Sequence, residues 1–246
     1  MIRAPRTLLA SITFAALLGG LGSAALAAAV PRSLDSGSAS HILARSLADA
    51  RQQHSVHVVE VEHAGKSVLT QTDNSNERSG EQQLVFSTGA QVDIRLFRTT
   101  LFIKANAKGI VLVYGKTDPT YSNKWISVAS SNAAYKTLAN GIDFTSLIAE
   151  MPPSGKLTKS RIETVAGHRV IAIHGRPNQV AQKVDGSETF DVSTSPPYLP
   201  PRITGRLSGN GHSATLTISF SDWSRNFVIA TPSPSIEITS TNLLHK

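Results

Sequence analysis

The chain has 246 residues, a formal net charge of +7 at pH 7 and no cysteine. Its lysines and arginines are scattered, which excludes the concentrated basic stripe of a nucleic-acid-binding protein and is typical of a solvated surface, with at most a weak preference for anionic lipid head groups. Without disulfides, the fold must be held by an apolar core.

The N-terminus has the pattern of a secretory signal. Arg3 and Arg6 precede an apolar run over residues 8–21, and the Ala-Leu-Ala sequence of residues 25–27 is a suitable cleavage site. We therefore expect residues 1–27 to be a signal peptide and the remainder to be exported. The alternative is a retained anchor, because the apolar character continues past the cleavage site and is just long enough to span a bilayer.

The exported part has the size of one domain. We expect a polar linker over residues 28–40, a single domain over 41–240 and a short tail over 241–246. Apolar residues near helical spacing predict a first helix over 41–51. From His54 onward the pattern changes to that of strands.

The first block of strands predicts an antiparallel meander. The runs SVHVVEVEH and KSVLTQTDN are joined by Ala64-Gly65, which indicates a hairpin. QQLVFS, QVDIRLF and TTLFIKA follow in order, with a break at Gly89. We expect these segments to pair with their neighbours along the chain.

A helical insert follows the first strands. Helices are predicted over 106–114, where Asn106 is a suitable cap, and over 131–140, with Gly141 as the stop. A further helix over 143–151 is capped by Asp143 and has one apolar face. A short strand, KWISV, lies between the first two of these helices.

The second block of strands completes an α+β fold. Strands are predicted over 156–165, 169–174, 187–193, 202–208 and 213–221. The segment FDVSTSPPYLPPRITG has strand residues on both sides of two proline pairs, so we interpret it as a rigid corner between neighbouring strands. A strongly curved antiparallel sheet with helices packed in its concave face is the economical arrangement, and the space between them is either an apolar ligand site or filled core.

No pattern in the sequence indicates catalysis. Gly65-Lys66-Ser67 lacks the earlier glycine of a phosphate-binding loop, and no G-x-S-x-G motif is present. His54, His57 and His63 lie along one strand and not at a metal-ligand spacing, so we expect no metal site and no cofactor.

The acidic residues are also dispersed along strands. We therefore interpret Glu60, Glu62, Asp93, Glu163 and Asp191 as part of the solvent-facing side of the sheet.

The order of these segments resembles the actinobacterial cell-envelope lipoproteins of the LppX/LprG type, relatives of the LolA carrier fold. The resemblance rests on SVHVVEVEHAGKSV, TLFIKAN, NKWISV, FTSLIAEM, the proline corner and the closing LTISFSDWSRNFVIATPSP. It covers residues 41–238. The resemblance implies a half-open antiparallel barrel with helices in its mouth and a cavity for lipids or lipoglycans.

One departure from that family concerns membrane attachment. Its lipoproteins carry a cysteine directly after the signal, whereas this chain has ALAAAVPRS there. We therefore expect an extracellular or cell-envelope protein that is not lipidated, unless its signal segment remains as an anchor.

These observations predict a non-enzymatic carrier or binding protein for a lipid or other apolar ligand, with a protein-interaction or sensor module on the same fold as the alternative. We expect a monomer that makes transient contact with the membrane or an envelope protein. The mouth of the ligand space should lie near the helical insert. The residues predicted to face that space are Val59, Val61, Ile94, Leu101, Ile103, Leu112, Phe144, Leu147, Ile148, Ile171, Ile173, Leu216 and Ile218.

Overall fold

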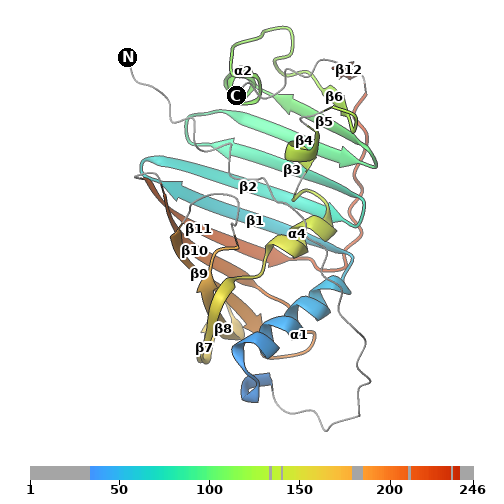
Figure 1. Ribbon diagram of the computed structural model, residues 1–246. Helices are drawn as coiled ribbons and strands as arrows, with labels where there is room; N and C mark the ends of the chain where they lie inside the picture. The colour runs from blue at the N-terminus through green and yellow to red at the C-terminus, as the bar shows by residue number, and fades with distance from the viewer. Residues whose placement is uncertain are drawn as a thin grey trace.

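The chain folds into one long β-sheet with helices on one side of it (Figure 1). The computed structural model describes residues 34–132, 135–139, 141–178, 185–209, 212–233 and 235–238. The strands are β1 (Ser55–Ala64), β2 (Ser67–Asn76), β3 (Ser79–Phe86), β4 (Gln91–Phe97), β5 (Thr100–Ala105), β6 (Ile126–Ala129), β7 (Ser154–Val165), β8 (His168–Arg176), β9 (Asp185–Ser193), β10 (Arg202–Gly209), β11 (His212–Ser221) and β12 (Ile236–Glu237). The helices are the 3-10 turn η1 (Leu34–Ser36), α1 (Ala39–Arg51), α2 (Ala107–Tyr114), α3 (Tyr135–Ala139) and α4 (Phe144–Glu150).

The sheet is open and mostly antiparallel. Within the described residues its strand order is β12-β6-β5-β4-β3-β2-β1-β11-β10-β9-β8-β7, and only β12 and β6 run parallel. The two predicted blocks of strands are thus two meanders, which meet where β1 pairs with β11. The strands near β7 are steeply rotated relative to those near β6 (Figure 1). The predicted α+β fold class is confirmed.

The helices of the insert begin at the predicted caps. The side-chain oxygen of Asn106 accepts a hydrogen bond from the backbone N–H three residues later, at 2.8 Å, and that of Asp143 does the same at 3.0 Å. Gly141 has a positive φ of 75°, as the predicted helix stop requires. α3 is shorter than the predicted helix over 131–140, of which residues 133, 134 and 140 lie outside the described part.

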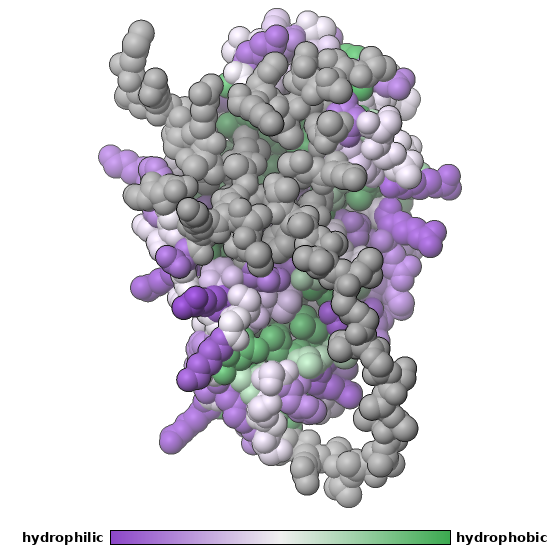
Figure 2. All heavy atoms as spheres, viewed as in Figure 1, coloured by the Kyte–Doolittle hydropathy of each residue, from purple (hydrophilic) through white to green (hydrophobic). Residues whose placement is uncertain are grey.

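The apolar core consists of two clusters. The first joins α1 and α4 to β1 and to strands β8 to β11, and Figure 2 shows apolar side chains gathered on this side of the molecule. The second joins strands β3 to β6 to α2, α3 and the residue before Asp143. Each cluster therefore packs different helices on different strands: α1 and α4 in the first cluster, and α2 and α3 in the second.

The proline-rich corner joins β9 to β10, which pair antiparallel as predicted. The backbone N–H of Tyr198 donates a hydrogen bond to the Asp49 carboxylate at 3.0 Å, and the Arg45 guanidinium lies 5.7 Å from the centre of the Tyr198 ring. Leu199 packs against the first cluster. The corner therefore also holds α1 against the sheet.

Gly80 marks a close approach between β3 and the segment that precedes α4. A Cβ at this position would lie 2.2 Å from the carbonyl oxygen of Ile142, which accepts a hydrogen bond from the Ser75 hydroxyl at 2.7 Å. We expect Gly80→Ala to lower the free energy of unfolding by about 1–3 kcal/mol, because the backbone has to shift to make room. Urea denaturation measures this loss.

The matched control is Gly205→Ala on β10. A Cβ there would meet its nearest neighbour at 3.5 Å, an ordinary van der Waals contact. We expect this substitution to change the free energy of unfolding by less than about 1 kcal/mol. Equal losses for the two variants would contradict a special role for the Gly80 contact.

Three predicted segments lie wholly or partly outside the described residues. The signal peptide (1–27) and the tail (241–246) lie outside them. The predicted linker over 28–40 is replaced, from residue 34 onward, by η1 and the start of α1, which Ser38 caps. In the part of the chain that the structure describes, no helix is both long and apolar enough to cross a membrane.

Candidate functional site

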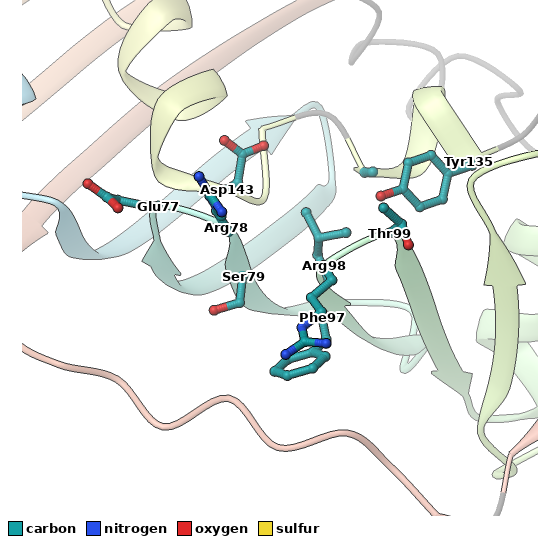
Figure 3. A pocket seen from close by; sticks show the side chains of 10 residues that line it. Glu77, Arg78, Ser79, Phe97, Arg98, Thr99, Tyr135 and Asp143 are labelled. Carbon is teal, nitrogen blue, oxygen red and sulfur yellow. The ribbon is translucent and has the colours of Figure 1, made fainter.

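An open hollow of about 1010 Å³ lies at the ends of β3 and β4, beside the helical insert (Figure 3). The β2–β3 turn, the β4–β5 turn, α3 and the cap of α4 supply its lining, which consists of Glu77, Arg78, Ser79, Leu96, Phe97, Arg98, Thr99, Tyr135, Ala139 and Asp143. Leu96 and Ala139 also belong to the second apolar cluster. The floor of the hollow is therefore continuous with the core.

The rim of the hollow carries charges of both signs. The lining includes the acids Glu77 and Asp143 and the arginines Arg78 and Arg98. Glu77 contacts His54 Nδ1 at 2.6 Å, and Asp143 caps α4, so both carboxylates already have partners within the fold. Two acids and two bases leave the rim without a net preference for one sign of ligand charge.

A second feature is a line of polar side chains on the inner face of the sheet, the face that carries the helices. It follows β2 and its two neighbours, and we name it the polar strip. Its members are Glu60, Glu62, Gln71, Asp73 and Gln82.

The strand register places the polar strip between the two apolar clusters. Cross-strand partners follow one another in the row Phe220, Val58, Asp73, Gln82, Ile94, Ile103, Ile126. Residues directly opposite each other in a sheet share a face. Since the first two of these residues belong to the first cluster and the last three to the second, the polar pair between them interrupts a continuous apolar face.

Asp73 is the most deeply buried member of the polar strip. Its side chain is 1% exposed, Gln71 donates a hydrogen bond to its Oδ2 at 2.8 Å, and its Oδ1 has no partner. Burial raises the pKa of Asp73 to about 7, against the lowering effect of the Gln71 and Gln82 amides. A carboxyl in this position is therefore partly protonated at neutral pH.

Burial also raises the pKa values of the other acids on the inner face. Burial, and then the nearby carboxylates of Asp73 and Glu62, raise the pKa of Glu60 to about 8. Burial also raises the pKa of Glu62 and, on β9, raises that of Glu188 to about 8. Glu188 Oε1 is buried without a hydrogen-bond partner, and its residue lies in register with Gly205, Leu216 and Glu62 on the same inner face.

This placement corrects the interpretation of the acidic residues. Glu60 and Glu62 lie on the inner face of β1 with Val56 and Val58, and not on the solvent-facing side. Asp191 is also buried, with no exposed surface, and forms an ion pair with Arg202. The sheet tolerates these acids because hydrogen bonds, raised pKa values or an arginine compensate their burial.

The predicted ligand-facing residues divide between the two clusters and do not surround one shared space. The second cluster contains Ile94, Leu101 and Ile103. The first cluster contains or packs against Phe144, Leu147, Ile148, Ile171, Ile173 and Ile218. A role for any of them in binding remains a prediction.

The remaining four predicted residues lie elsewhere. Val59 and Val61 alternate with Val58 and Glu60 along β1, so they are on the outer face, contrary to the prediction. Leu112 is half-buried on α2, whose core contacts are made by its neighbours, and Leu216 is half-buried on the inner face of β11. Neither of these two leucines belongs to a cluster.

The lining of the hollow was not predicted from the sequence. It is built from two turns and a short helix, and no periodic pattern marks these residues. The histidines remain dispersed, and among the described residues no group of three or more histidine or acidic side chains is placed to hold a metal ion.

No protein-family model and no curated protein sequence matches the chain. Solved structures do match. LppX, a lipoprotein of Mycobacterium tuberculosis, is 13% identical with a TM-score of 0.51, over 76% of this chain and 96% of that one. LprF of Mycobacterium bovis is 15% identical with a TM-score of 0.52, over 80% of this chain and 99% of that one. The chain therefore has the LppX-like fold, an open antiparallel sheet with helices on its inner face.

Proposed function

We propose that the protein is an exported, non-enzymatic carrier or binding protein for a lipid or other apolar ligand in the cell envelope. The observation that carries the proposal is the hollow whose floor runs into the second apolar cluster through Leu96 and Ala139. Its volume of about 1010 Å³ is at the upper end of the range for small-molecule sites. Leu96 and Ala139 make part of its lining apolar, which a lipid tail needs because each buried polar group without a partner costs about 1–3 kcal/mol.

The location is inferred from two further observations. The N-terminal residues have the order of a secretory signal, and the structures with the same fold include LppX, a lipoprotein by name. This chain has no cysteine that could carry a lipid anchor. We therefore place the mature protein outside the cytoplasmic membrane without covalent lipid attachment.

The distribution of apolar side chains favours the carrier over a protein-interaction module. A docking module needs a contiguous exposed apolar patch. Among the described residues the large apolar side chains that are exposed, Val111, Ile162 and Val228, lie on different parts of the chain. The interaction module becomes the leading function if no ligand is found.

Native mass spectrometry of the protein purified from the envelope or culture medium, followed by lipid extraction, tests the proposal. We expect a co-purified apolar ligand that is lost on Tyr135→Arg, because Tyr135 lines the hollow, packs against the second cluster and is only half-buried. Circular dichroism checks that this variant remains folded.

The control is Val228→Arg, at a side chain that is 87% exposed, and we expect it to retain the ligand. Absence of bound lipid from every preparation of the wild-type protein would overturn the carrier function.

A further inference from the structure

We propose that the polar strip is the binding site for a positively charged head group, an ammonium group attached to an apolar body that packs on the adjoining clusters. This inference rests on the proposed function, specifies the chemical class of the ligand and places its head group on the polar strip, whose residues are distinct from those that line the hollow. An acidic site on the inner face would differ in charge from the chain as a whole, which is basic.

The first argument is the sign of the charge on the inner face. Glu60, Glu62 and Asp73 lie on adjacent strands, and Glu188 lies further along the same face. Their cross-strand neighbours on that face, from β3 and from strands β10 and β11, are uncharged. The ion pairs among the described residues all lie elsewhere, so none of these carboxyls has a cationic partner there.

The second argument is the unpartnered oxygen of Asp73. Its Oδ1 accepts no hydrogen bond although the side chain is 1% exposed. A buried acceptor without a donor is rare in native proteins and costs free energy. An N–H donor that carries a positive charge would satisfy this oxygen and also relieve the repulsion among the neighbouring carboxyls.

The arrangement of the carboxyls favours an organic cation over a metal ion. A metal ion needs several oxygens that converge within about 2.3–2.6 Å of one point, and among the described residues no acidic cluster has that geometry. Glu60 and Asp73 are diagonal neighbours on adjacent strands, which places their α-carbons about 7–8 Å apart. This separation suits a larger head group that contacts several carboxyls at once.

The apolar flanks complete the site. Val58 of the first cluster and Ile94 of the second are the nearest members of the row on either side of Asp73 and Gln82. Those two residues are themselves buried, but Ile218 and Leu69, the cross-strand partners of Glu60 and Glu62, are half-buried and leave apolar surface on either side of β1 for the chain of a ligand. An anionic head group in the same place would be repelled by the carboxylates.

Binding of the cation should release protons. The folded protein holds these carboxyls partly protonated at neutral pH, since burial raises their pKa values, whereas a bound ammonium group favours the charged form. The titratable groups that face the site in the described strands are Glu60, Glu62, Asp73 and Glu188. The affinity for the cation should therefore increase as the pH rises.

The test compares three probes with the same dodecyl chain, each used below its micellar concentration. Isothermal titration calorimetry with dodecylammonium, whose head group carries N–H donors, and with dodecanoate and dodecanol measures binding to the whole mature protein. We expect the ammonium probe to bind at least about tenfold more tightly than dodecanoate near neutral pH, and more tightly at about pH 8 than at about pH 6.

The variants isolate the polar strip. Glu60→Gln combined with Asp73→Asn keeps the shape of both side chains and should lower the affinity for the ammonium probe by about tenfold or more, with dodecanol unaffected. The control combines Glu81→Gln with Asp93→Asn, which removes the same number of acids from the opposite face of the sheet and should change neither probe.

The possible outcomes separate the two proposals. Equal binding of all three probes, or an ammonium affinity that the polar-strip variant leaves intact, overturns the cation site while the carrier function stands. If only dodecanol or only dodecanoate binds, the cation site is likewise overturned and the carrier function stands. If none of the probes binds and the purified protein contains no lipid, the carrier function fails as well.

Discussion

Asp73→Asn is expected to stabilise the protein by up to about 4 kcal/mol at about pH 8 and to change its stability little at about pH 3. The pKa of Asp73 is raised from 3.8 to about 7 by burial, and each pKa unit corresponds to about 1.4 kcal/mol. Asparagine has nearly the same shape and no charge to bury. The expected gain is therefore the cost of ionising Asp73 inside the sheet.

The direction of the pH dependence follows from proton linkage. Between about pH 4 and pH 7 the folded state holds the Asp73 proton more tightly than the unfolded chain, so stability falls as the pH rises. The contribution is complete below the unfolded pKa and is lost by the time the pH passes the folded pKa. Glu60 and Glu188, with pKa values raised to about 8, act in the same direction.

Urea denaturation of the wild type and of Asp73→Asn over this pH range measures the effect. The wild type should lose stability toward alkaline pH, and the difference between the two proteins should widen as the pH rises. Asp93→Asn, at a half-exposed residue of β4 on the opposite face, should give a curve parallel to that of the wild type. A constant difference for Asp73→Asn across the range would mean that burial does not perturb this carboxyl.

The cost of the polar strip supports a functional reason for it. Apolar residues at Asp73 and Glu60 would join the two clusters into one continuous core and would avoid the ionisation penalty. Proteins commonly give up stability at sites that bind ligands. The stability expected for Asp73→Asn and the loss of cation binding expected for the polar-strip variant are thus two consequences of the same buried acids.

The features that local sequence determines were predicted correctly. Asn106 and Asp143 satisfy backbone N–H groups at the starts of their own helices, so their effect does not depend on distant parts of the fold. The hairpin at Gly65 likewise needs only a residue that adopts a positive φ, here 59°. The predicted meander of the first block was also correct, because β1 to β5 each pair with the next strand in the sequence. The pairing of β1 with β11 and the parallel strand β12 were not predicted.

The facing of β1 was predicted wrongly for a physical reason. Its sequence alternates only weakly, with valines on both faces: Val56 and Val58 on one and Val59 and Val61 on the other. Because Glu60 and Glu62 were assumed to face solvent, Val59 and Val61 were predicted to face inward. Only the packing of α4 and α1 on the sheet decides which face is buried.

The hollow and the polar strip depend on long-range placement. The lining of the hollow combines Arg78 and Arg98, from two turns, with Tyr135 of α3. The polar strip combines side chains from β1, β2 and β3 that only the register aligns. No spacing in the sequence indicates either site.

Arg202→Ala is expected to destabilise the protein by about 3–5 kcal/mol, because it leaves a buried carboxylate without its charged partner. Arg202 Nε lies 2.8 Å from Oδ2 of Asp191, whose side chain has no exposed surface and whose Oδ1 has no other hydrogen-bond partner. Burial raises the pKa of Asp191, while Arg202 lowers it. Removal of the arginine therefore raises this pKa further.

Urea denaturation at two pH values distinguishes this mechanism from simple loss of packing. The loss should be largest near pH 8 and should shrink as the pH falls, because a protonated Asp191 no longer needs a cation. Adding Asp191→Asn to Arg202→Ala should restore much of the stability at high pH, which measures the coupling of the pair. Arg206→Ala, at an exposed arginine four residues further along β10, should cost less than about 0.5 kcal/mol. If Arg202→Ala cost no more than Arg206→Ala, or its cost did not vary with pH, then Asp191 would not depend on the arginine for its burial.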